Sequence, residues 1–161
     1  MERTIIKILK NGDAWLQQLV DEAHAHGDTQ AIPPLHLKIV GQMALLIADL
    51  SFPITATMDI DILHNLPHFA AKKLGELFLD SGLVLESEHH IIWMPEQTVY
   101  HPLFDGHYIH TEVADPLYVI ASKCKFKRSK DKTLIQSYFQ NFPEAAEKIA
   151  AMKIETAWVN S

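Results

Sequence analysis

The sequence has little that would indicate a secreted or membrane-bound protein. Cys124 is the one cysteine in 161 residues, so no disulfide can form within the chain, which is typical of proteins in a reducing compartment. No uninterrupted apolar run reaches the roughly 20 residues that span a bilayer. Charged residues interrupt the apolar N-terminal segment, which therefore does not resemble a signal peptide. We expect a cytoplasmic protein without membrane association.

Positive charge is scarce over most of the chain. Residues 1–114 carry 6 Lys and Arg against 15 Asp and Glu, a net charge of −9, whereas residues 115–161 carry 8 against 5, a net charge of +3. An acidic protein is a poor non-specific binder of nucleic acid, because both carry negative charge. The basic C-terminal part could still contact a phosphate group locally.

The apolar pattern predicts one domain with a mixed α/β fold: a sheet, flanking helices and a C-terminal helical layer. The N-terminal segment, 1–34, should be helical, with a break near Asn11-Gly12 and Asp13 capping its second half. The sheet core should occupy 35–114 and the C-terminal helices 115–161. Strands are expected at 35–40, 58–63, 84–86, 89–94, 98–104 and 107–113, and helices at 43–50 and 67–80.

Two short signals mark where elements turn or begin. Asp105-Gly106 lies between two strand-like runs and predicts a hairpin. Asp115-Pro116 predicts a helix start, because an aspartate caps the first backbone N–H groups and proline fits the first helical turn.

The segment TMDIDIL places two aspartates, Asp59 and Asp61, among strand-forming residues. In a strand, side chains two residues apart emerge on the same face, about 7 Å apart at the backbone. Two such carboxylates repel each other unless a cation or a shared proton compensates. This acidic face suits a hard cation such as Mg²⁺. The alternative is an edge strand whose aspartates point into water.

Two further segments carry candidate binding residues. In IVGQMALLI, Gly41 leads from a strand into a helix, where a glycine lets the backbone approach a ligand and the helix N-terminus favours anions. The segment DPLYVIASKCKFKRSKDKTLI combines Lys123, Arg128, Lys130 and Asp131 after a capped helix. Such a basic cluster is also typical of a solvated helix face, and Asp131 is expected to pair with a nearby Lys or Arg.

Taken in order, these segments resemble the motifs of the nucleotidyltransferase superfamily. The resemblance is to its small bacterial branch, which includes minimal nucleotidyltransferases and abortive-infection toxins of toxin–antitoxin pairs. Its pattern is Gly-Gly or Gly-Ser, a helix, Asp-x-Asp on a strand, and a later Lys–Arg–Lys-Asp signature. It covers roughly residues 37–135, with matches at Gly41, Ala44, Leu45, Thr57, Asp59, Asp61, Lys123, Arg128, Lys130 and Asp131.

The resemblance implies a polymerase-β-like site. Asp59 and Asp61 would hold Mg²⁺, or Mn²⁺, against the oxygens of a nucleoside triphosphate, and an acceptor, RNA or protein, would attack the α-phosphate in line. The backbone amides of Gly41 and Gln42 would contact phosphate, and Lys123 would neutralise its charge. The remaining nucleotide-binding residues implied are Thr57, Arg128 and Asp131.

The chain departs from this pattern at three places. Gln42 replaces the second Gly or Ser, and Thr55 stands where many relatives carry Arg. A third carboxylate is missing from HHIIWMP, so Glu112 on another strand is the best substitute, ahead of Glu88 and Glu96.

Without that carboxylate there is no evident base to deprotonate an acceptor hydroxyl. A second reading is therefore a catalytically degenerate binding module, for instance in a toxin–antitoxin system, with a partner protein or a second copy. A metal-dependent phosphohydrolase is a third, weaker reading, because no His-Asp pairing is present.

For the other reactive side chains, the sequence favours structural roles over catalysis or metal binding. His107 and His110 are three apart in a predicted strand and so should face opposite sides, and no spacing typical of a zinc site is present. Cross-strand histidine pairs remain possible. Cys124 has basic neighbours but no catalytic histidine at a suitable spacing, which favours an inert, packed thiol.

Overall fold

The computed structural model describes residues 1–86 and 92–161 and has the predicted mixed α/β fold. The described helices are α1 (Glu2–Ala25), α2 (Gly41–Ile47), α3 (His68–Asp80), α4 (Pro116–Phe126), α5 (Lys132–Asn141) and α6 (Ala145–Ala151), with short 3-10 helices η1 (Ser129–Asp131) and η2 (Ala157–Asn160). The described strands are β1 (Leu35–Val40), β2 (Asp59–Ile62), β3 (Val84–Glu86), β4 (Tyr100–Asp105) and β5 (Ile109–Ala114). None of these helices is both long enough and apolar enough to cross a bilayer.

The strands form one mixed sheet in the order β3-β2-β1-β5-β4. Strand β1 is parallel to β5 and antiparallel to β2, so the acidic strand is a direct neighbour of the strand that ends at Val40. A helical crossover through the Gly41 helix would have made these two strands parallel, or separated them by another strand. Helix α2 is too short to act as a crossover, and residues 48–58 return the chain so that β2 runs back along β1.

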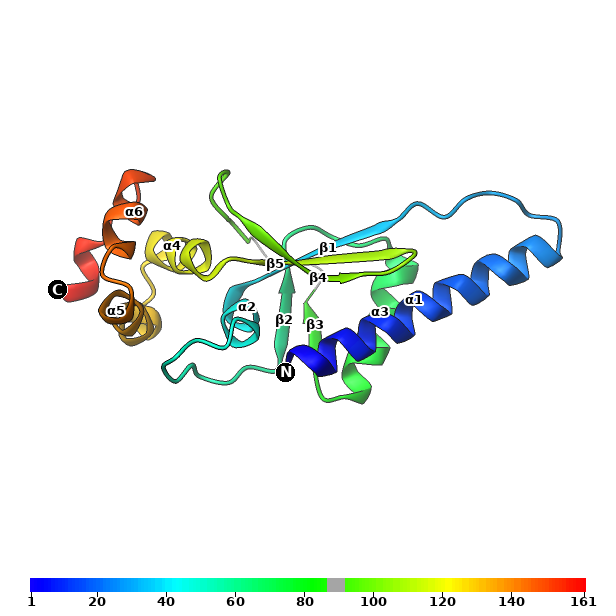
Figure 1. Ribbon diagram of the computed structural model, residues 1–161, viewed down its shortest axis with the longest axis horizontal. Coiled ribbons are helices and arrows are strands. Elements are labelled where there is room, and N and C mark those ends of the chain that lie inside the picture. Colours follow the sequence, from blue (N-terminus) through cyan, green and yellow to red (C-terminus); the bar gives the residue numbers. More distant parts are fainter. Residues whose placement is uncertain (87–91) are drawn as a thin grey trace.

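The longer helices form two groups, one along the sheet and one beyond its end (Figure 1). Helices α1 and α3 contact each other and pack against strands of the sheet through buried apolar side chains such as Leu9, Leu16 and Phe78. Helices α4, α5 and α6 gather at one end of the sheet, beyond the point where β5 finishes (Figure 1). Helix α2 contacts α4, which brings the segment after β1 next to the segment after β5.

The predicted break in the N-terminal helix is wrong, because α1 continues through Asn11-Gly12. The glycine serves close packing instead. A Cβ at Gly12 would lie 2.7 Å from Leu74 Cδ2 and 3.1 Å from Ile109 Cδ1, both on buried side chains. Gly12 therefore lets α1 approach both α3 and β5.

The predicted capping role of Asp13 is wrong. Its side chain instead holds the turn before β5. Its carboxylate accepts N–H bonds from His107 at 3.1 Å, Tyr108 at 2.7 Å and Ile109 at 2.9 Å. Turn N–H groups would otherwise need water or another acceptor. Asp13 thus fixes the β4–β5 connection to α1 across more than half the length of the chain.

Two predicted local signals are confirmed. Strands β4 and β5 form an antiparallel hairpin around Asp105-Gly106. Asp115 caps α4, because its side chain accepts the N–H of Leu117 at 3.0 Å and Pro116 occupies the first turn. In the predicted strand 89–94, residues 89–91 lie outside the described part, and residues 92–94 are not in a strand.

Candidate functional site

Three separate stretches of the chain line one cavity of about 580 Å³. They are the start of α2 with the loop before β2, the acidic strand β2, and the basic segment that follows α4. Every predicted site residue except Glu112 lines this cavity: Gly41, Gln42, Thr57, Asp59, Asp61, Lys123, Arg128 and Asp131. The fold therefore brings together side chains from all three segments singled out in the sequence.

The acidic side of the cavity comes from the alternation in β2. Ile60 and Ile62 are buried in the core, whereas Asp59 is exposed and Asp61 half-buried. Strand β2 lies between β1 and β3, so it is not the edge strand of the alternative interpretation. Thr57 accepts the N–H of Asp59 at 3.1 Å and so orders the entry into the strand.

Gly41 is required at the start of α2 for two reasons. Its φ of +69° is the left-handed conformation that side chains disfavour. A Cβ there would also lie 2.7 Å from Asp61 Oδ2. Gly41 therefore leaves the space that the Asp61 carboxylate occupies.

Gln42 ties the neighbouring loop to α2. Its Nε2 donates to the carbonyl oxygen of Thr55 at 3.0 Å. The residue that departs from the superfamily pattern thus holds the loop that leads to β2. Helix α2 has only seven residues, so its dipole is a weak source of positive potential for an anion.

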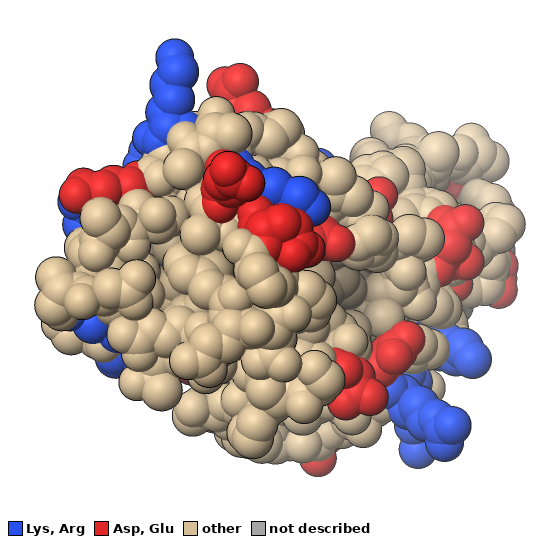
Figure 2. Space-filling model, turned by 60° about the vertical axis from the view of Figure 1, so that its left-hand side comes forward, with Lys and Arg blue, Asp and Glu red and all other residues tan. Residues whose placement is uncertain are grey.

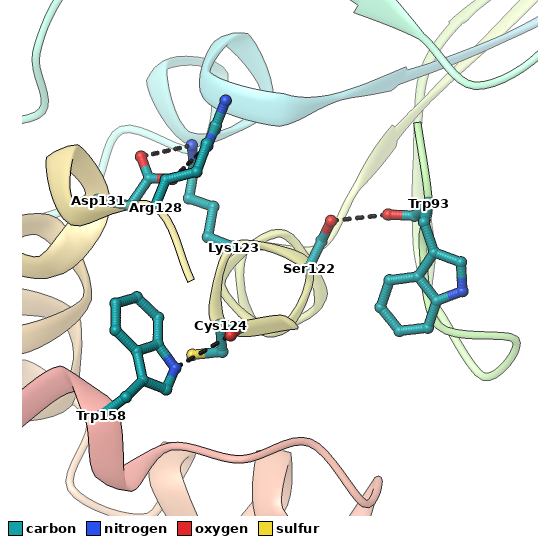
Figure 3. A network of polar contacts seen from close by, with 7 residues as sticks. All are labelled: Trp93, Ser122, Lys123, Cys124, Arg128, Asp131 and Trp158. Carbon is teal, nitrogen blue, oxygen red and sulfur yellow. Dashed lines mark hydrogen bonds and ion pairs between the residues drawn. The ribbon is translucent and has the colours of Figure 1, made fainter. Parts of the chain in front are cut away.

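The basic side of the cavity is built around Asp131. Lys123 Nζ lies 3.4 Å from Asp131 Oδ1, and Arg128 Nε donates to Asp131 Oδ2 at 2.9 Å, so that the three side chains point toward one another (Figure 3). The predicted pairing of Asp131 is confirmed. Two cations share one carboxylate, which leaves an excess of positive charge beside the cavity.

Burial sets the electrostatics of this cluster. The side chains of Lys123 and Asp131 are 8% and 7% exposed, whereas that of Arg128 is 51% exposed. Burial lowers the pKa of Lys123, and the nearby Asp131 carboxylate opposes this effect. Lys127 at the end of α4 has a φ of +51°, and this left-handed turn leads the chain into η1, which ends at Asp131.

Glu112 lies in a different cavity. It is opposite Lys38 of β1 and lines a space of about 720 Å³ that His36, His64 and His110 also line. The register places Glu112 and Asp61 on the same face of the sheet but on the order of 12 Å apart at Cα, from standard strand spacings. Among residues 1–86 and 92–161, no three His, Cys, Asp or Glu side chains are grouped to hold a metal ion.

Glu86 is a carboxylate near the acidic pair that no sequence motif had indicated. Strand β3 pairs in parallel with β2, and Glu86 is in register with Asp61. In-register residues of neighbouring strands project on the same face, so Glu86 is the nearest acidic neighbour of Asp61 within the sheet. Of the other substitutes, Glu96 is exposed in a turn, and Glu88 lies outside the described residues.

The remaining reactive side chains are Cys124, His107 and His110, for which the sequence favoured structural roles. Cys124 is buried, and burial raises the pKa of its thiol to about 12, as expected for an inert cysteine. His107 lies before β5 and not within it, whereas His110 stacks on His36 of the neighbouring strand with ring centroids 5.3 Å apart.

The exterior shows no basic surface on the side presented in Figure 2. There, Lys and Arg side chains are separated by Asp, Glu and broad areas of uncharged residues. The basic residues that matter to the site are those gathered at the cavity.

No protein-family model matches this chain, and no significant match exists among curated proteins or solved structures. No relative therefore indicates an activity, a ligand or a partner for the cavity. Its function has to be argued from the side chains that line it.

Proposed function

We propose that this protein binds a nucleoside triphosphate together with a divalent cation and transfers a nucleotidyl group to an acceptor, RNA or protein. One observation carries the proposal: a single cavity is lined by the acidic pair of β2 and by the basic cluster after α4. A metal–polyphosphate complex has this mixed charge, with a cation for the carboxylates and oxyanions for the lysine and arginine side chains.

The acidic pair fits Mg²⁺. Proteins usually bind this ion through one or two carboxylates, with substrate phosphates and water completing its shell. Asp59 and Asp61 offer two carboxylates to the same cavity, and Mn²⁺ takes the same oxygen donors. When bound, such an ion neutralises charge on the phosphates during transfer.

The basic cluster fits the phosphates. Lys123 is a point charge held in place by Asp131, and the half-exposed Arg128 has donors that can turn to a phosphate oxygen. Exposed Lys130 adds a third cation to the lining. Because α2 is short, these side chains and not its N-terminus would supply most of the positive potential.

The acceptor hydroxyl would need a base. Loss of a general base typically costs about 10²–10⁴ in rate. Glu86 is in register with Asp61, and Glu112 lines another cavity, so Glu86 is the better candidate. A binding module without transfer is the second candidate function, because the described part of the chain groups no third carboxylate with Asp59 and Asp61.

Calorimetric titration with ATP tests the binding site, with and without Mg²⁺. We expect the double variant Asp59→Asn, Asp61→Asn to lose at least tenfold in affinity when Mg²⁺ is present. When Mg²⁺ is absent it should bind ATP more tightly than the wild type does, because the two carboxylates no longer repel the phosphates. Asp80→Asn, at the exposed end of α3, is the control and should bind as the wild type does. Equal affinity of wild type and double variant, or binding by neither, would refute the site.

A transfer assay separates the two candidate functions. The purified protein is incubated with labelled nucleoside triphosphates, Mg²⁺ or Mn²⁺, and total cellular RNA and protein. We expect weak transfer that Glu86→Gln abolishes and Glu112→Gln leaves intact. Transfer abolished only by Glu112→Gln would assign the base to Glu112 instead. Binding without transfer under all conditions would favour the binding module.

A further inference from the structure

A second, smaller cavity adjoins the polar one. Its volume is about 300 Å³, and it shares Gly41, Asp61, Lys123 and Arg128 with the larger cavity. Beyond these shared residues its lining is mainly apolar, with contributions from Val40, Met94, Val119 and Phe126. A molecule that reached both cavities would have a charged part and an apolar part joined near Lys123.

We propose that this apolar cavity binds the base of the nucleoside triphosphate whose phosphates occupy the polar cavity, and that it prefers purines to pyrimidines. The proposal rests on the proposed function and adds the class of base. A volume of about 300 Å³ is at the lower end of ligand pockets. It suits a single heterocycle better than a peptide segment, and the cations at the junction favour a ligand that carries phosphate.

Phe126 is the aromatic side chain placed to stack on a base. It is the last residue of α4, lines the cavity and is 46% exposed, so part of its ring is accessible. Met94 lines the same space and can pack its thioether against a ring. Stacking on an aromatic side chain is tolerant of sequence, because every base has a π-face.

Trp93 also lines this cavity, but one face of its ring is covered by a lysine. Lys125 Nζ lies 4.1 Å from the centroid of its ring, and the indole points away from the Ser122 hydroxyl (Figure 3). The backbone carbonyl of Trp93 accepts the Ser122 hydroxyl at 2.7 Å, so the proton of that hydroxyl is already committed. Few side-chain donors are left to read the edge of a base. Selection should therefore follow ring size, with ATP and GTP similar and both above CTP and UTP.

Calorimetric titrations in the presence of Mg²⁺ test this inference. The ligands are ATP, GTP, UTP and inorganic tripolyphosphate, and the proteins are the wild type, Phe126→Ala and Phe69→Ala. Phe69 is a matched control, because it is 45% exposed and does not line either cavity. Thermal unfolding of each variant verifies that it is folded, and Met94→Ala provides a second test from another segment.

We expect Phe126→Ala to lose about tenfold in affinity for ATP and GTP, less for UTP, and nothing for tripolyphosphate, with Met94→Ala changing in the same direction. Phe69→Ala should match the wild type. If tripolyphosphate binds but all three nucleotides bind Phe126→Ala as they bind the wild type, the base site is overturned while the phosphate site stands. Affinity for UTP equal to that for ATP overturns the purine preference. If neither nucleotides nor tripolyphosphate bind, the proposed function fails, and this inference fails with it.

Discussion

Asp13 offers a sharp test of how the fold is held together. Its carboxylate accepts three backbone N–H groups, at 2.7, 2.9 and 3.1 Å, from the turn before β5. Hydrogen bonds to charged groups contribute about 1.5–3 kcal/mol each, and partial exposure of Asp13 argues for the low end. Asp13→Ala would leave the part-buried N–H groups of Tyr108 and Ile109 without this acceptor. We expect it to lower the free energy of unfolding by about 2–4 kcal/mol.

The pH dependence of this contribution has a definite sign. Burial alone would raise the pKa of Asp13, but the backbone hydrogen bonds and the nearby His107 outweigh it, and the net pKa is lowered. Because the folded pKa lies below the unfolded value of about 3.9, the stabilisation is fully present above that value. It is lost as the pH falls through the folded pKa. The difference between wild type and Asp13→Asn should therefore be fully present at pH 5 and shrink below pH 4.

Urea unfolding followed by tryptophan fluorescence and circular dichroism, at a series of pH values, measures both effects. Asp21→Asn is the control, since Asp21 is exposed on the same helix and its carboxylate accepts a hydrogen bond from the exposed side chain of Gln17. It should change stability by less than about 0.5 kcal/mol. A stability of Asp13→Ala equal to that of the wild type would show that the three hydrogen bonds do not hold the turn. A pH-independent difference would contradict the role of the charge.

Three further substitutions have expected outcomes that urea unfolding can check. Gly41→Ala places a side chain on a residue whose φ is +69°, with the new Cβ 2.7 Å from a carboxylate oxygen. It should lower the free energy of unfolding by about 1–3 kcal/mol. Titration with ATP in the presence of Mg²⁺ should also show weaker binding. Asp131→Asn leaves Lys123 buried without its counter-charge and should cost about 3 kcal/mol, more at pH 7 than at pH 10. Gly12→Ala gains about 1 kcal/mol in helix propensity but forces its Cβ against buried Leu74, at a cost of about 1–3 kcal/mol, so the net effect should be destabilising.

Features coded by neighbouring residues could be predicted from the sequence. The hairpin at Asp105-Gly106 and the cap at Asp115 follow from local turn and capping chemistry. The alternation of Asp59 and Asp61 with buried isoleucines follows from the period of a strand. That the three segments would share a site was implied only by their resemblance to the nucleotidyltransferase motifs, and one cavity is lined by residues from all three.

Features decided by distant residues could not be predicted. Gly12 and Asp13 have the local signature of a helix break and cap, yet Leu74 and the turn before β5 determine what they do. The position of Glu86 beside Asp61 depends on the register between β2 and β3, which neither strand specifies alone. The same holds for Glu112, whose distance from the acidic pair follows from the place of β1 between β2 and β5.

The arrangement of charge in the cavity also predicts how the binding of a cation affects the affinity for a nucleotide. Asp131 holds Lys123 and Arg128 but cannot neutralise both, so the cavity has fixed positive charge close to the carboxylates of Asp59 and Asp61. Free polyphosphate would be repelled by the carboxylates, and a free divalent cation by the basic cluster. Each ligand removes the repulsion that the other meets, and such coupling is reciprocal in binding free energy. Mg²⁺ should therefore tighten ATP binding by the same factor as ATP tightens Mg²⁺ binding.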